Sequence, residues 1–348
     1  MSSIKSLRTL PVLLLALLFA LSPAMLVAQD EPSQKESKKE KKEERREAAA
    51  QATPVLWREP TDIATRDLFK GPGGDEMAPD LTKVTFENAE TGGYSVKWDV
   101  RDGAGKKWTA KLGSEAQTDT VALRLVWAAG YLTEVSYLVP CAHIAGAPKP
   151  PGNRGIERCE GDGFVNVRFK SKPEGTKNLD TWSWKDNPFH GTKELQGLIV
   201  LMGLLNNWDL KQDNNKILLA KGADGQDELW YVVSDLGATF GKTGGAITRS
   251  RNKPEDYVKS GFIQKVDGDR VKFQYHGKQS DLFDNITVTQ AKWLGDLLSQ
   301  LSKQQIDDAF RAGNYKPEEI DALSYELRAR INELHSLHAP GEAAGQGN

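Results

Sequence analysis

The sequence predicts a mixed α+β fold in two parts, a β-rich part with one long helix followed by a mainly helical part. Three observations support this prediction. Short runs in which apolar and polar residues alternate gather between about Thr82 and Phe169. A nearly continuous apolar stretch, LQGLIVLMGLL, ends at Leu205 and is typical of a buried helix. Helical periodicity then dominates from Thr289 to Leu337, and strands followed by helices are typical of α+β proteins.

The N-terminus has the pattern of a secretory signal peptide, which we assign to residues 1–28. Lys5 and Arg8 precede an apolar segment from Leu10 to Leu21, and small residues ending at Ala28 offer a cleavage site. The apolar segment is short for a membrane span. We therefore expect an exported protein, periplasmic or extracellular, with no stable membrane span after cleavage; an uncleaved N-terminal anchor is the alternative.

Both ends of the folded region are expected to be disordered. Residues 29–54 mix lysine and glutamate with few apolar side chains, so they bury too little surface to offset the entropy of ordering. Residues 339–348 form a short tail. The net charge of −2 argues against general binding of polyanions, so we expect no nucleic-acid partner.

The chain has two cysteines, Cys141 and Cys159. In an oxidising compartment they can close a disulfide loop around a segment rich in proline and glycine, which would add about 3 kcal/mol of stability. Two free thiols are the alternative.

The β-rich part is assigned to residues 55–185. The expected strands are Val84–Phe86, Tyr94–Val100, Trp108–Leu112, Val135–Val139 and Phe164–Phe169. A turn at Asp102–Gly105 joins the second and third strands. A helix over Gln117–Ala129, with Gly130 as its stop, follows the third strand.

The mainly helical part is assigned to residues 186–338. Its first helix is predicted over Thr192–Leu205, and two strands joined by a turn follow at Asn214–Leu219 and Leu229–Val233. The C-terminal helices are expected at Thr289–Leu301, Lys303–Ala312 and Pro317–Leu337.

Two short motifs carry the strongest indication of chemistry. An Asp-Leu-Lys-x-x-Asn run contains Asp209, Lys211 and Asn214, and an Asp-Leu-Gly begins at Asp235. Phosphoryl transfer needs a carboxylate near the attacking hydroxyl, and amide and carboxylate oxygens on the metal that binds the phosphates. The alternative is a polar turn that ends the preceding helix.

With these motifs, the chain resembles the protein-kinase-like superfamily, and more closely its HipA-type bacterial and secretory-pathway branches, from about Thr82 to Gly241. The resemblance implies a two-lobed protein-kinase-like fold that uses ATP with Mg²⁺ or Mn²⁺. It implies that Asp209 is the catalytic base and that Lys211 lies near the transferring phosphate. It also implies that Asn214 and Asp235 bind the metal.

The resemblance extends upstream to the nucleotide-binding residues. Lys111 matches the strand lysine that contacts phosphates, and a buried lysine needs a partner. Asp119 in the following helix is the favoured partner, and Glu115 is the alternative. Gly92 and Gly93 would let the backbone approach the phosphates. The alternatives are an edge-strand lysine and a glycine-rich hairpin without a ligand.

The chain also departs from the family pattern. Asn207-Trp208 replaces the usual His-Arg, no Ala-Pro-Glu follows, and Gly237–Thr243 lacks the spacing of a P-loop. The loop after Gly237 contains several cations that could hold an anionic substrate, or a phosphate added to a nearby hydroxyl: Lys242, Arg249, Arg251 and Lys253 near Thr243, Thr248 and Ser250. A basic surface loop without a ligand is the alternative.

The function predicted from the sequence is an exported, atypical kinase-like phosphotransferase. It would move the γ-phosphate of a nucleotide to a hydroxyl of an unknown protein or small molecule. A pseudokinase that binds or scaffolds in the cell envelope is the main alternative, and an unrelated structural envelope protein is a third. The five histidines show no metal-ligand or triad spacing, so metalloprotease and esterase functions have no basis in the sequence.

Overall fold

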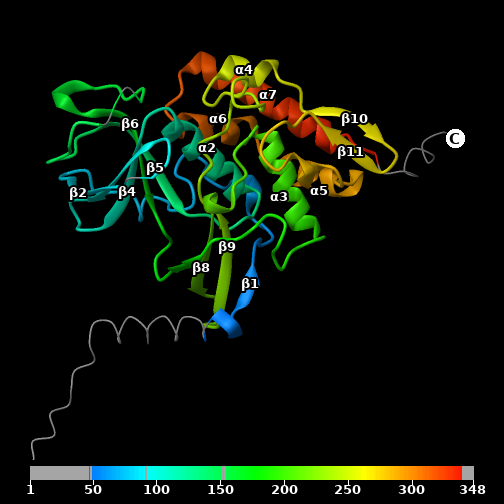
Figure 1. Cartoon of the computed structure of the whole chain (residues 1–348), viewed down its shortest axis with the longest axis horizontal. Helices are drawn as coiled ribbons and strands as arrows, with labels where there is room; N and C mark the ends of the chain where they lie inside the picture. The colour runs from blue at the N-terminus through cyan, green and yellow to red at the C-terminus, as the bar shows by residue number, and fades with distance from the viewer. Residues whose placement is uncertain (1–46, 48, 91, 151, 153, 339–348) are drawn as a thin grey trace, which may run out of the picture. The chain divides into compact units, whose positions relative to one another are not determined.

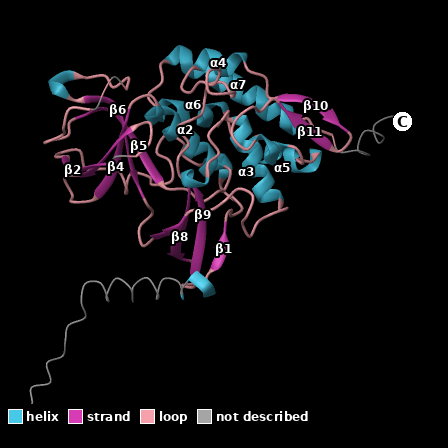
Figure 2. Cartoon of the chain, in the orientation of Figure 1, coloured by secondary structure: helices cyan, strands magenta, loops and turns pink. Residues whose placement is uncertain are grey.

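The computed structural model describes residues 47–338, except 48, 91, 151 and 153. The predicted signal peptide, most of the predicted linker and the predicted tail lie outside the described residues. The described part combines a five-stranded sheet, a four-stranded sheet, a two-stranded hairpin and several helices (Figure 2). This architecture confirms the predicted α+β class. The predicted boundary between residues 185 and 186 stays a prediction.

The five-stranded antiparallel sheet lies in the N-terminal half and has the order β2-β3-β4-β6-β5. Its strands are β2 (Thr85–Glu90), β3 (Val96–Arg101), β4 (Lys107–Leu112), β5 (Val135–Ala142) and β6 (Phe164–Ser171). Helix α2 (Glu115–Ala128) follows β4 and packs against β4, β5 and β6 (Figure 1). All five predicted strands and the predicted helix are therefore present, with shifted ends.

The two faces of this sheet differ in chemistry because side chains alternate along a strand. Val96, Trp98 and Val100 of β3 are buried in an apolar cluster. Lys97 lies between them on the opposite face and pairs in register with Lys111, which pairs in turn with Arg168. Three cations thus lie side by side across the face that α2 covers in part.

Helix α3 (Lys193–Leu204) forms the centre of the C-terminal half. Thr192 caps it by accepting a hydrogen bond from the backbone N–H of Leu195, and most of its side chains are buried. It contacts α5 and α7. The remaining helices are α4 (Pro254–Lys259), α5 (Val288–Leu298), α6 (Lys303–Ala312) and α7 (Pro317–His335), of which α4 was not predicted. Across the described ranges, no helix is both long and apolar enough to cross a membrane.

The four-stranded sheet has the order β1-β9-β8-β7. Its strand β1 begins within the segment that was predicted to be a disordered linker. Strands β8 (Asn215–Lys221) and β9 (Asp227–Val233) were predicted, whereas β7 (Lys177–Asp180) was not. Strand β1 (Thr53–Val55) pairs in parallel with β9, so the disordered linker cannot extend to residue 54. A second unpredicted feature is the hairpin of β10 (Ile263–Asp267) and β11 (Arg270–Phe273).

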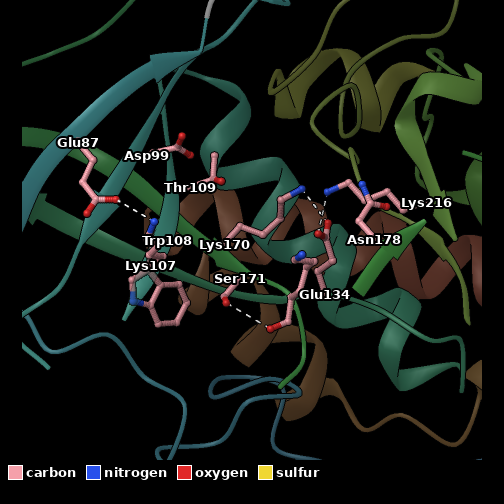
Figure 3. A pocket seen from close by; sticks show the side chains of 11 residues that line it. Glu87, Asp99, Lys107, Trp108, Thr109, Glu134, Lys170, Ser171, Asn178 and Lys216 are labelled. Carbon is pink, nitrogen blue, oxygen red and sulfur yellow. Dashed lines mark hydrogen bonds and ion pairs between the residues drawn. The ribbon is translucent and has the colours of Figure 1, made fainter. Parts of the chain in front are cut away.

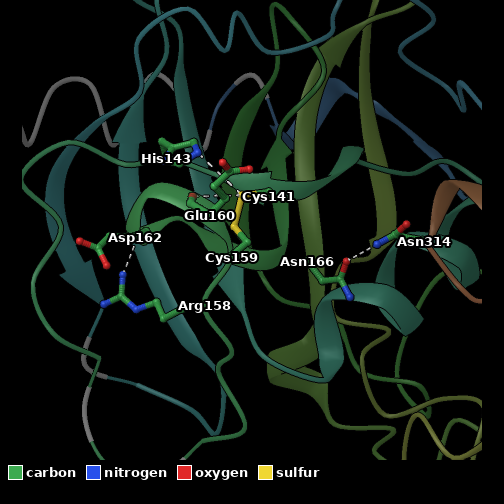
Figure 4. The surroundings of a disulfide bond; sticks show 8 residues. All are labelled: Cys141, His143, Arg158, Cys159, Glu160, Asp162, Asn166 and Asn314. Carbon is green, nitrogen blue, oxygen red and sulfur yellow. Dashed lines mark hydrogen bonds between the residues drawn. A yellow bond between two sulfur atoms is a disulfide. The ribbon is translucent and has the colours of Figure 1, made fainter.

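Cys141 at the end of β5 and Cys159 form a disulfide bond, so the alternative of two free thiols is wrong (Figure 4). The two cysteines are separated by 18 positions in the sequence. The bond therefore restricts the unfolded chain across the proline- and glycine-rich segment between β5 and β6.

Replacing both cysteines by serine is expected to lower the free energy of unfolding by about 3 kcal/mol, because the unfolded chain gains the entropy of an open loop. Urea unfolding of the oxidised wild type, the reduced wild type and the double variant measures this effect. The reduced wild type and the double variant should agree. Equal stability of all three proteins would contradict the prediction.

Candidate active site

Residues from three separate segments line one cleft of about 440 Å³. The segment after α3 contributes Asp209, Lys211 and Asn214, and the segment after β9 contributes Asp235. The connection between β2 and β3 contributes Gly92 and Gly93. Six of the eight residues predicted to form the site therefore line this cleft, and the other two, Lys111 and Asp119, lie buried beside it.

Lys111 joins the sheet, α2 and the segment after β9. Its ammonium nitrogen lies 2.8 Å from Asp119 Oδ2, 2.9 Å from Asp235 Oδ1 and 3.4 Å from Glu115 Oε2. The side chain is fully buried, and β4 lies between β3 and β6. The alternative of an edge-strand lysine is therefore wrong. Both carboxylates considered as partners contact Lys111, with Asp119 closer.

Asp119 is a fully buried carboxylate held between two cations. It contacts Lys111 and Arg168, and its Oδ1 accepts a hydrogen bond from the backbone N–H of Leu236 at 3.2 Å. Burial alone would raise the pKa of Asp119, but the charges of Arg168 and Lys111 outweigh burial and hold the pKa below its usual value. Asp119 is therefore ionised at neutral pH and links α2 to the Asp-Leu-Gly segment.

Asp235 faces the cleft with 28% of its side chain exposed. Its two oxygens contact different lysines, because Lys97 Nζ lies 3.4 Å from Oδ2. Burial alone would raise the pKa of Asp235, but the charges of Lys111 and Lys97 lower it by a larger amount. The pKa of Asp235 is therefore well below its usual value. Asp235 is therefore ionised and directed toward the cleft.

Gly237 lets the Asp-Leu-Gly segment approach α2. A side-chain carbon added to Gly237 would lie 2.8 Å from Cβ of Glu115. This close contact explains why glycine follows Asp235 and Leu236.

Lys97 is a site residue that sequence reasoning missed. It lies opposite Lys111 in the register of the β3–β4 hairpin, and both side chains reach Asp235. The alternation of Val96, Lys97 and Trp98 was the available signal, because a lysine between two core-facing residues must lie on the opposite face.

Asp209, which also lines the cleft, is held by two lysines. Lys211 Nζ lies 2.9 Å from Oδ2, and Lys278 Nζ lies 2.8 Å from Oδ1. Burial alone would raise the pKa of Asp209, but hydrogen bonds from Lys278 and Lys211 lower it below its usual value. The side-chain amide of Asn214 donates to the backbone carbonyl of Asp209 at 2.7 Å. Asp209 is therefore an ionised carboxylate in a fixed position, and the motif does more than end α3.

Two arginines of the loop after Gly237 reach the cleft. The guanidinium carbons of Arg249 and Arg251 lie 4.0 Å and 4.7 Å from the centre of the Trp208 ring. Arg251 also forms an ion pair with Glu115. Lys242 and Lys253, in contrast, are exposed and do not line the cleft. Of the four cations in the predicted basic loop, two therefore line the cleft and two lie on the surface.

The donor set of the cleft fits a hard divalent cation. In the described part of the chain, no group of three or more His, Cys, Asp or Glu residues is arranged to hold a metal ion. Mg²⁺ usually needs only one or two protein carboxylates, with water and phosphate oxygens completing its coordination. The carboxylate of Asp235 and the amide of Asn214 line the same cleft and supply oxygen ligands of this kind. These two residues would hold the metal.

Comparison with solved structures finds kinases. The chain is similar to the Helicobacter pylori proinflammatory kinase CtkA, with 12% identity, a TM-score of 0.43 and coverage of 75% of this chain and 95% of that chain. It is also similar to the Golgi casein kinase with Mn/ADP bound, with 10% identity, a TM-score of 0.38 and coverage of 76% of this chain and 75% of that chain. No family model and no curated protein sequence matches.

Proposed function

We propose that this protein is a metal-dependent, kinase-like phosphotransferase that moves the terminal phosphate of a nucleotide to a hydroxyl of a protein or small molecule. One observation carries the proposal. Asp209 and Asn214 come from the segment after α3 and Asp235 comes from the segment after β9, but all three line one cleft, and Lys111 contacts Asp235 from the sheet side. These are the residue types that phosphoryl transfer requires, and several cations surround them.

Each residue then has a defined role. Lys111 and Lys97 would bind the phosphates of the donor, and Asp235 and Asn214 would hold Mg²⁺ or Mn²⁺, which would neutralise charge on those phosphates. Asp209 would orient the acceptor hydroxyl and accept its proton as the new bond forms. Its low pKa keeps it ionised, so it is ready to accept a hydrogen bond. Lys211 would stabilise the phosphate during transfer.

We further propose that the protein acts outside the cytoplasm. The signal-peptide pattern of residues 1–28 supports export, and the disulfide between Cys141 and Cys159 supports an oxidising compartment. Retention of the protein in the cytoplasm after expression from its full gene would contradict this proposal.

Nucleotide binding tests the proposed function most directly. Thermal unfolding of the chain from Ala52 onward, with ATP and Mg²⁺ or Mn²⁺, should show added stability of about 2.7 kcal/mol when free ligand is 100 times its dissociation constant. The shift should require the metal and should disappear in Asp235→Ala. The exposed carboxylate Asp186 provides a matched control, since Asp186→Ala should keep the shift.

Three outcomes of this experiment can be distinguished. A metal-dependent shift with release of phosphate supports the phosphotransferase. A shift without any phosphate transfer would indicate a nucleotide-binding pseudokinase. No shift with any nucleotide or metal would overturn both.

A further inference from the structure

The side chain of Arg251 joins three other segments that line the cleft. It forms an ion pair with Glu115, the first residue of α2. Its guanidinium carbon lies 4.4 Å from the centre of the Tyr94 ring and 4.7 Å from the centre of the Trp208 ring. Tyr94 belongs to the glycine turn, by which we mean residues 92–95 between β2 and β3. We call these four cleft-lining residues, Arg251, Glu115, Tyr94 and Trp208, the clasp.

Few atoms surround the glycine turn in the described part of the chain. A side-chain carbon added to Gly92 would meet no described atom within 4 Å, and Gly93 has a positive φ of 90°. Tyr94 is 56% exposed, so its ring is not held by the core. Two guanidinium groups lie near this ring, that of Arg251 and that of Arg154, which is 5.4 Å from the ring centre. Contacts from other segments therefore decide where the turn lies.

Glu115 connects the glycine turn to a lysine that is proposed to bind the donor. Its Oε1 pairs with Arg251, and its Oε2 accepts a hydrogen bond from the hydroxyl of Ser95 and lies 3.4 Å from Lys111 Nζ. Only 8% of the Glu115 side chain is exposed, so water screens these contacts little. One carboxylate therefore holds the turn at Ser95 directly and at Tyr94 through Arg251.

Trp208 fixes the other side of the clasp. Only 3% of Trp208 is exposed, and its indole N–H donates to the backbone oxygen of Ser250 at 2.8 Å. The ring therefore has a set orientation, and it lies one position before Asp209, the proposed base. Arg251 thus links the turn that would cover the donor to the segment that would meet the acceptor.

A buried ion cluster joins the two larger sheets at a second place (Figure 3). Glu134 contacts Lys170 of β6 at 2.8 Å and Lys216 of β8 at 2.9 Å, and only 2% of its side chain is exposed. Separating these groups would leave a buried charge without a partner. In the clasp, the side chain of Arg251 is 21% exposed and Tyr94 is more than half exposed, so water can solvate both when they separate. We therefore expect the cleft to open at the clasp while the ion cluster stays intact.

We propose that Arg251 is a positioning residue that holds the glycine turn over the phosphates of the donor. The inference rests on the proposed function and adds a residue to its donor site. Arg251 acts through Tyr94 and Glu115, because its guanidinium group is already engaged by the protein. The clasp sets the position of the turn before a donor binds, so binding costs less conformational entropy. Loss of Arg251 should therefore weaken donor binding.

Calorimetric titration of ATP with Mg²⁺ into the wild-type chain and Arg251→Gln tests the proposal. The dissociation constant should rise by about tenfold in the variant. The rate of phosphate release at saturating ATP should change by less than about threefold, because Lys111, Lys97 and the metal ligands are unchanged. The exposed arginine Arg328 of α7 provides the matched control, since it lies outside the cleft and Arg328→Gln should bind ATP as the wild type does.

An unchanged dissociation constant in Arg251→Gln would overturn the proposal. Tighter binding would also overturn it, since it would show that Arg251 obstructs the donor. In both cases the proposed phosphotransferase would stand. Failure of the wild type to bind ATP would overturn the proposed function itself, so the two failures are distinguishable.

A double-mutant cycle tests whether Arg251 acts through the ring of Tyr94. Tyr94→Ala should weaken ATP binding about as much as Arg251→Gln, and the double variant should bind less than about threefold more weakly than either single variant. Tyr94→Phe keeps the ring and should bind ATP as the wild type does.

Independent contacts with the donor would give a different result in this cycle. A ring that stacked on the donor, or an arginine that bound it directly, would contribute separately, so the two losses would multiply to about a hundredfold and contradict the proposal. If Arg251→Gln does not fold, the same cycle with Arg251→Lys decides, because lysine keeps a charge for Glu115 but cannot stack as a planar guanidinium does.

Discussion

An Asp235→Asn variant is expected to lose phosphoryl transfer by at least about 10²–10³-fold while remaining folded. Asp235 is the carboxylate that both binds the metal and meets Lys111 and Lys97 in the proposed mechanism. The amide keeps the shape of the side chain but has no negative charge, so the metal would be held weakly and the two lysines would lose their ion pair. Lys111 would keep Asp119 at 2.8 Å, which preserves the link between the sheet and α2.

The acceptor does not need to be known for this measurement. Release of labelled phosphate from ATP with Mg²⁺ reports transfer to water, and labelling of the chain itself reports transfer to its own hydroxyls. Asp186→Asn makes the same chemical change at an exposed position outside the cleft and should keep wild-type rates. Thermal unfolding should remain cooperative in both variants. Wild-type rates in Asp235→Asn would show that any transfer occurs without this carboxylate.

Local patterns made much of the fold predictable. The β3–β4 hairpin has both a turn sequence and two alternating strands, and α6 begins and ends at the predicted residues. The N-terminal boundary of α6 is sharp because Ser302 and Gln305 form a capping box. Where a segment carries its own turn or cap, the sequence alone is informative.

Elements that depend on distant partners were missed. Strand β1 is three residues long and exists because β9 accepts it, and β7 likewise depends on β8. Neither segment has an alternation of apolar and polar residues that would distinguish a strand from a loop. The disordered linker was therefore predicted too far toward the folded region.

The residues of the candidate site also divide into those that lie in a local motif and those that meet only through distant contacts. Asp209, Lys211 and Asn214 could be predicted because they lie in one motif, whereas Lys278 reaches Asp209 from a distant position in the sequence. The ion pair between Lys170 and Glu134 could not be predicted from the sequence either. Lys170 and Glu134 become neighbours only through the pairing of β5 with β6, and a single sequence contains no direct signal of that pairing.

The largest expected effect on stability is that of Asp119→Asn, which should lower the free energy of unfolding by about 3–5 kcal/mol at neutral pH. Asp119 is fully buried and neutralises Lys111 and Arg168, both of which have at most 1% of their side chains exposed. Asparagine would leave Arg168 without its carboxylate partner, and the cost of a buried, uncompensated charge exceeds that of the lost hydrogen bonds. Urea unfolding at pH 7 measures the difference.

The pH dependence distinguishes this electrostatic effect from a packing defect. The pKa of Asp119 in the folded protein is lower than in the unfolded chain, where it is about 3.9. The carboxylate therefore contributes its full stability above that value and loses it as pH falls through the lower, folded pKa. The difference between wild type and Asp119→Asn should be constant from pH 7 to about pH 5 and should shrink below about pH 4. A packing defect would give the same difference at every pH.

A compensating variant tests whether the unpaired charge of Arg168 causes the loss of stability in Asp119→Asn. Adding Arg168→Gln to Asp119→Asn removes the stranded guanidinium, so the double variant should be more stable than Asp119→Asn alone, even though it carries one more substitution in the core. Lys111 would still have Asp235 at 2.9 Å in both variants. Recovery would show that the charge of Asp119 matters because two buried cations from the sheet meet there, which is the same arrangement that places Lys111 at the proposed phosphate site. Further loss of stability would instead show that Arg168 has a structural role independent of Asp119.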